Sequence, residues 1–96
     1  MLKADSPVQV TVLDETGAVS SGRVTQSSSE IVDLLVEKPA NPGAAVKLEG
    51  DDALFLGEVS SCRPEGSSFV MTVELHHALY NTRELALLAK RLLDSL

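Results

Sequence analysis

The stretch ALFLGEVSSCRPEGSSFVMTVEL, residues 53–75, decides the fold. In its second half the apolar side chains fall on every second residue: Phe69, Met71, Val73 and Leu75. This alternation predicts a strand with one face on a core. In the first half Leu54 and Leu56 share one phase and Val59 has the other, so we expect a bulge near Gly57-Glu58 that turns Val59 back to the core. With a turn at residues 64–66, the two arms predict a β-hairpin with a longer loop.

Four further strands are predicted ahead of this hairpin, at residues 8–12, 19–26, 31–36 and 45–49. The run 31–36 is nearly all apolar and is also compatible with a short helix, but its β-branched residues and the stop at Pro39 favour a strand. Six short strands separated by turn residues predict a small six-stranded antiparallel β-barrel over residues 7–80. Residues 1–6 lack periodicity and are expected to form a flexible N-terminus.

A different pattern ends the sequence. Asn81 is a candidate helix N-cap, and Glu84 three residues later completes a pair that resembles a capping box. One helical stripe then follows, made of Leu85, Leu88, Leu92 and Leu96. We therefore expect residues 81–96 to form an amphipathic helix packed on the barrel. Leu87 and Leu93 fall away from the stripe, and such an apolar flank predicts a surface for a protein partner or for self-association.

Composition narrows the range of partners. The chain has 96 residues, the size of one domain, and its 14 acidic and 8 basic side chains give a formal charge of -6. That charge argues against nucleic acid polymers and anionic membrane surfaces as partners. A single cysteine allows no intramolecular disulfide, which fits a reducing compartment. No signal peptide and no apolar run of bilayer length is evident, so we expect a cytoplasmic protein without membrane insertion.

Candidate metal ligands gather near the end of the hairpin. His76 and His77, with Glu74 and Cys62, invite a metal hypothesis. Adjacent histidines on a strand point to opposite faces, and no second ligand pair has zinc-like spacing, so no metal site is predicted. For Cys62 a small apolar filler is the preferred interpretation.

Other polar clusters also have structural explanations. The acidic residues Glu49, Asp51 and Asp52 lack the ligand spacing of a calcium loop and are interpreted as a solvated turn. The serines at 27–29 lack a glycine-rich neighbourhood and a plausible base. No triad, carboxylate pair or phosphate loop emerges, so the sequence predicts neither catalytic residues nor a cofactor.

The hairpin segments 57–63 and 69–75 resemble those of PilZ domains, and so do the proline-glycine turn before residues 45–48 and the closing helix. The resemblance covers most of the chain from Val8 onward. PilZ domains are six-stranded β-barrels with a helix, and many bind the bacterial second messenger cyclic di-GMP. The resemblance therefore implies a barrel fold and a role in that type of signalling.

The nucleotide motifs of the family are mostly missing. Where PilZ domains carry two arginines before the barrel, this chain offers only Lys3, which lacks the forked contact of an arginine. The second family motif aligns with Gln26, Ser28 and Ile31, and only the serine matches. Ile31 replaces a glycine that the family uses where the backbone comes close to the ligand.

Two further residues bear on the same question. Thr72 replaces a glycine common in the last strand of the family, and Arg23 is the only other basic residue nearby. Without the charge-assisted contacts that the family provides, the free energy of the remaining contacts would not offset the free energy of desolvating a doubly charged nucleotide.

The resemblance, with its motifs lost, implies a degenerate PilZ domain. We expect a non-enzymatic regulatory adaptor that acts by protein contact and binds cyclic di-GMP weakly or not at all. One alternative is a genuine cyclic di-GMP receptor that uses Lys3, Arg23, Gln26 and Ser28. Another is a structural homodimer held together by the C-terminal helix.

Overall fold

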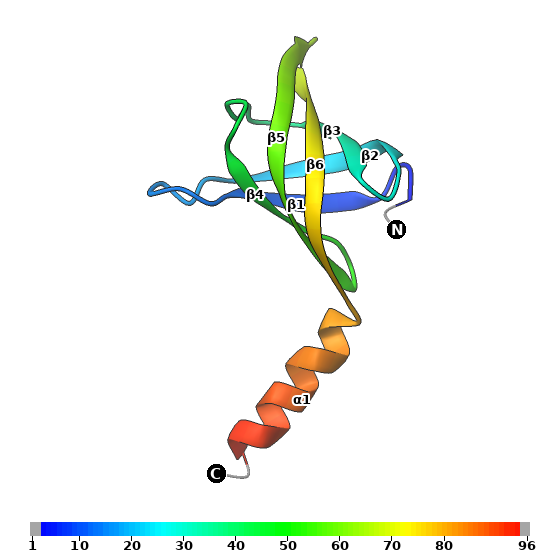
Figure 1. Ribbon diagram of the computed structural model, residues 1–96, viewed down its shortest axis with the longest axis vertical. Helices are drawn as coiled ribbons and strands as arrows, with labels where there is room; N and C mark the ends of the chain where they lie inside the picture. The colour runs from blue at the N-terminus through cyan, green and yellow to red at the C-terminus, as the bar shows by residue number, and fades with distance from the viewer. Residues whose placement is uncertain (1–2, 95–96) are drawn as a thin grey trace.

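The computed structural model describes residues 3–94, which form six strands and one helix. In chain order they are β1 (Pro7–Val12), β2 (Val19–Ser27), β3 (Ile31–Val36), β4 (Ala45–Glu49), β5 (Ala53–Glu65), β6 (Ser68–Tyr80) and α1 (Thr82–Asp94). The strands pair antiparallel in the order β1-β2-β3-β6-β5-β4, and β4 pairs with β1 to close the barrel (Figure 1). The predicted small antiparallel barrel with one C-terminal helix is therefore confirmed.

Apolar side chains, most of them aliphatic, fill the interior of the barrel. Alternation along each strand turns every second residue inward. The core residues are Val8, Val10, Val24, Val32, Leu34, Val36, Val46, Leu48, Phe55, Val59, Met71 and Val73. Cys62 is partly buried against this core, in agreement with its prediction as a small filler. Because the core is already complete, the interior needs no contribution from α1.

Only β5 differs from the prediction in phase, because Met71 and Val73 of β6 lie in the core as expected. Phe55, Gly57 and Val59 are buried along β5, so Leu54 and Leu56 lie on the outer side and not on the core side. The register shifts beside Gly57 as predicted, but the extra residue belongs to the other strand. Leu56 pairs with His77 and Gly57 pairs with Leu75, which leaves His76 as the bulged residue of β6.

Gly57 permits this close approach of the two strands. A Cβ at this position would collide with the carbonyl oxygen of Glu74 and would lie 2.8 Å from Cγ1 of Val73. Glycine is therefore required where the backbone of β6 passes over β5.

The bulge reverses the phase of the last part of β6. Leu75, Ala78 and Tyr80 lie on the side of Phe55, although Leu75 and Ala78 are three residues apart. Leu79 and His77 consequently share the outer side with Leu54 and Leu56.

The N-terminal prediction needs a correction for the residues that the structure describes. The amide of Asp5 donates a hydrogen bond to the carbonyl oxygen of Val24 at 2.7 Å. The amide of Val24 donates one to the carbonyl oxygen of Ser6 at 2.9 Å. These bonds tie Asp5 and Ser6 to β2, so this part of the segment is attached to the barrel and is not the flexible end that was predicted. The first two residues of the predicted flexible segment lie outside the described part of the chain.

The helix does not pack on the barrel, contrary to the prediction. β6 runs past the barrel and passes almost directly into α1, which extends away from it (Figure 1). No residue of α1 is buried within the described part of the chain. The molecule is accordingly elongated, with principal extents of 50 × 29 × 22 Å. The predicted stripe residue Leu96 lies beyond the described residues.

The turn between β4 and β5 anchors the first turn of α1. Oδ1 of Asp52 accepts a hydrogen bond from the amide of Arg83 at 2.9 Å, and the guanidinium of Arg83 pairs with the carboxylate of Asp51. Asn81, the predicted cap, has a left-handed φ of 58° and accepts from the amide of Leu85 through its main-chain oxygen. The capping side chain is therefore Asp52, and the acidic turn is a helix anchor rather than a merely solvated loop.

Replacing Asp52 by alanine should fray the start of α1. The substitution removes the acceptor for the Arg83 amide, which costs about 0.5–2 kcal/mol of helix stability for a capping side chain. We expect Asp52→Ala to lower the helical circular dichroism signal of the chain and to leave the unfolding transition of the barrel unchanged.

Asp52→Asn is the matched control, because asparagine caps helices about as well as aspartate. It should keep the helical signal of the parent chain. An Asp52→Ala chain with an unaltered helical signal would contradict the anchoring role.

Candidate interaction surface

The leucines of α1 form an exposed apolar surface. Their exposed fractions run from 48% for Leu85 to 70% for Leu93. The members of this helix surface are Leu85, Leu87, Leu88, Leu92 and Leu93. Large apolar side chains gathered at this density on a single exposed element make α1 a candidate contact surface.

The helix is nevertheless amphipathic. At 3.6 residues per turn, Leu85, Leu88 and Leu92 share one stripe, whereas Lys90 lies about 160° around the helix from Leu88. Asp94 lies about 180° from Leu85 by the same spacing. The charged side chains therefore solubilise one side of α1 and leave the leucine stripe uncovered.

A second apolar surface lies on the barrel close to the start of α1. Leu54 and Leu56 of β5 and Leu79 of β6, here called the outer leucine patch, line a shallow hollow of about 250 Å³ on the outer side of the hairpin. Leu54 pairs directly with Leu79. Because β6 ends at Tyr80 and α1 begins at Thr82, the patch adjoins the helix.

Length makes the exposure of α1 energetically significant. The helix has 13 residues. Isolated helices of about 12–15 residues or fewer are only marginally stable in water, and most helices in proteins depend on packing of their apolar face. Within the described residues α1 has its cap but no packed face, so a covering surface would stabilise it.

Two of the predicted ligand residues come together on the outer side of the barrel. Gln26 and Ser28 line one hollow with Ser27, Ile31 and Asp33. The hydroxyl of Ser28 accepts from the amides of Ile31 at 3.1 Å and Glu30 at 3.3 Å. Its oxygen is thus already used to close the turn between β2 and β3.

A carboxylate occupies the same hollow. Asp33 pairs with Gln26 on one side and with Thr72 on the other, and its Oδ1 accepts from the Thr72 hydroxyl at 2.6 Å. Thr72 thereby holds a carboxylate in this hollow. None of the residues lining it is a lysine or an arginine.

The basic candidates lie elsewhere. Arg23 is exposed on β2 and lines a separate open hollow with Leu35 and Glu37. Lys3 is exposed ahead of β1, where its carbonyl oxygen accepts from the amide of Ser6 at 3.1 Å. The structure thus joins Gln26 to Ser28 in one hollow and places Arg23 in another.

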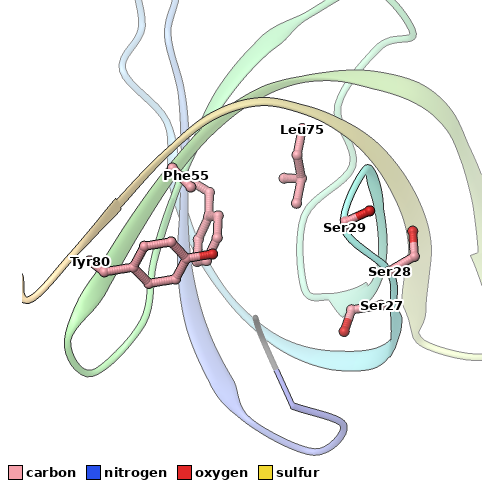
Figure 2. Close-up of a pocket in the computed structure, with 7 residues that line it drawn as sticks. Ser27, Ser28, Ser29, Phe55, Leu75 and Tyr80 are labelled. Carbon is pink, nitrogen blue, oxygen red and sulfur yellow. The ribbon is translucent and has the colours of Figure 1, made fainter.

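A small apolar hollow of about 120 Å³ opens at one mouth of the barrel. Figure 2 shows the serine turn 27–29 on one side of it and the rings of Phe55 and Tyr80 on the other. These two rings meet edge to face, with centroids 5.8 Å apart. None of the described residues that line the hollow is a histidine, an acidic residue or a lysine.

The predicted metal candidates are dispersed. His76 lies beside Glu58, with 3.9 Å between Nε2 and a carboxylate oxygen, while His77 faces the outer leucine patch. Among residues 3–94 no three histidine, cysteine or acidic side chains gather in a way that could hold a metal ion.

The sequence predicted part of the exposed leucine surface of α1. Leu87 and Leu93 are exposed as predicted, but Leu85, Leu88 and Leu92 were expected to pack on the barrel and are exposed as well. The outer leucine patch was missed because the phase reversal at His76 was not recognised. The signal in the sequence was the pair of adjacent polar residues His76 and His77, which puts Ala78 and Tyr80 out of step with Leu75.

In the described part of the chain no helix is long and apolar enough to span a bilayer.

No protein-family model matches the chain, and no curated protein matches it in a sequence comparison. The PilZ resemblance therefore stays a prediction drawn from the residues themselves.

Proposed function

We propose that this chain is a non-enzymatic, PilZ-like regulatory module that acts by protein contact through α1. The observation that carries the proposal is the helix surface itself, five leucines between 48% and 70% exposed on a helix that lies clear of the barrel. Covering such a surface removes apolar area from water at about 25 cal/mol per Å². The barrel serves as the scaffold that presents the helix.

The anchor supports this function. Asp51 and Asp52 hold Arg83 and the first helical turn, so α1 leaves the barrel from a fixed point. A helix capped at one end and uncovered along its apolar stripe suits the recognition mode in which an amphipathic helix enters an apolar surface of a partner.

Charge argues against the receptor alternative. A cyclic dinucleotide carries two negative charges, and the hollow beside Gln26 and Ser28 contains the Asp33 carboxylate. Like charges repel, and no lysine or arginine among the lining residues offsets this repulsion. Weak or absent nucleotide binding follows from this arrangement.

A photo-crosslinking amino acid placed at position 88 should capture a protein partner in cells. Leu88 lies in the exposed stripe, so the crosslinker would meet whatever covers α1. Position 90 is the matched control, because it lies on the same helix about 160° away. Adducts are expected from position 88 and not from position 90. Position 88 yielding no more adduct than position 90 would refute contact through the stripe.

Calorimetric titration with cyclic di-GMP should give no binding heat up to high micromolar nucleotide. The reason is the carboxylate of Asp33 and the lack of arginine pairs beside Gln26 and Ser28. A PilZ domain with both family arginines is the positive control. A saturable heat from this chain, lost on Arg23→Ala, would favour the receptor instead.

A further inference from the structure

We infer that the partner of α1 is a second copy of this chain, bound so that the two helices pack antiparallel. The inference rests on the proposed function and names its partner. It is carried by the spacing of the leucines, by the distribution of charge along α1 and by the position of the outer leucine patch.

Leucine spacing gives the contact. Leu85, Leu88 and Leu92 follow one another at intervals of three and four residues, the spacing of a coiled-coil seam. Two antiparallel copies can stack Leu85 of each on Leu88 of the other. Ala86 and Ala89 are small enough to let the helix axes approach closely.

Charge selects this direction of packing. Glu84 and Arg91 each precede a leucine of the stripe and are seven residues apart, so they occupy equivalent flanking positions. In the antiparallel register with Leu85 on Leu88, Glu84 of each copy flanks Arg91 of the other. Opposite charges therefore meet twice across the interface.

A parallel pair lacks this complementarity. It would bring both copies of Arg91 to the same end and both acidic turns, with Asp51 and Asp52, to the other end. Each chain carries a formal charge of -6, so this crowding of like charge would be unfavourable. The antiparallel pair keeps the two barrels at opposite ends.

The outer leucine patch extends the contact. A helix of 13 residues is only about 20 Å long, which is short for the roughly 1,200 Å² that a stable interface buries. In the antiparallel pair the C-terminal half of each helix reaches the first turn of the other. That turn adjoins Leu54, Leu56 and Leu79, so the patch can receive Leu92 and Leu93 of the second copy.

Sedimentation equilibrium of the full chain at micromolar concentrations tests the inference. We expect twice the chain mass for the parent protein and the chain mass for Leu88→Glu. Glu84→Arg and Arg91→Glu should each weaken the dimer roughly tenfold or more, because each change sets like charges together twice. Lys90→Glu is the matched control for Arg91→Glu, and it should leave the dimer intact because Lys90 lies away from the stripe.

Mixing the two charge variants gives the sharper measurement. An equimolar mixture of Glu84→Arg and Arg91→Glu places arginines only against glutamates, so the dimer should recover in the mixture. The inference would be overturned if the parent chain stays monomeric. It would also be overturned if the mixture dimerises no more tightly than either variant alone. If the parent chain is monomeric but position 88 forms crosslinks to other proteins, the inference of a dimer fails and the proposed function stands. If the parent chain is monomeric and position 88 forms no crosslinks to any protein, both proposals fail.

Discussion

The close approach of β5 and β6 at Gly57 determines which side chains reach the surface of this protein. Only a residue without a Cβ fits beneath the carbonyl of Glu74, and His76 is pushed out of register beside it. From that point Tyr80 turns toward Phe55 at the mouth of the barrel, while Leu79 turns outward. One backbone contact thus closes the core at one end of the hairpin and creates the outer leucine patch.

The same hairpin determines the position of α1. β6 extends past the core and leads into the helix, which takes its cap from Asp52 on the neighbouring turn. The barrel therefore fixes where the helix begins but leaves its leucines uncovered. Since a short helix gains most of its stability from packing, a surface outside the described chain is the natural complement to this arrangement. The proposed function by contact rests on that deficit, and the inferred self-association rests on the pattern of leucines and charges along the helix.

The strands could be predicted from the sequence because their signals are local. β-branched residues and the stop at Pro39 identified residues 31–36 as a strand, and the predicted bounds of β3 and β4 are those observed. Leu54 and Leu56 were assigned to the wrong face because a bulge was expected in β5 near Gly57. Instead β5 alternates regularly through Phe55, Gly57 and Val59, and the extra residue, His76, belongs to the opposite strand. A periodicity within one strand carries no information about a bulge in its partner.

Tertiary contacts were the harder part to predict. The spacing of Leu85, Leu88 and Leu92 identifies an apolar face but does not identify what covers it, and packing on the barrel was the wrong choice. Asp52 was taken for a solvated residue, because a cap supplied 31 positions away has no local signature. Of the candidate ligand residues, Gln26 and Ser28 share a hollow, whereas the carboxylate of Asp33 beside them was not foreseen.

Amide hydrogen exchange of α1 tests the central claim most directly, namely that nothing within the described chain packs against this helix. At a concentration where the chain is monomeric, amides of residues 86–94 should exchange orders of magnitude faster than those of β5 and β6. Protection of these helix amides should then rise as the protein concentration is raised. Helix amides that are protected as strongly as the barrel in the dilute monomer would contradict the account.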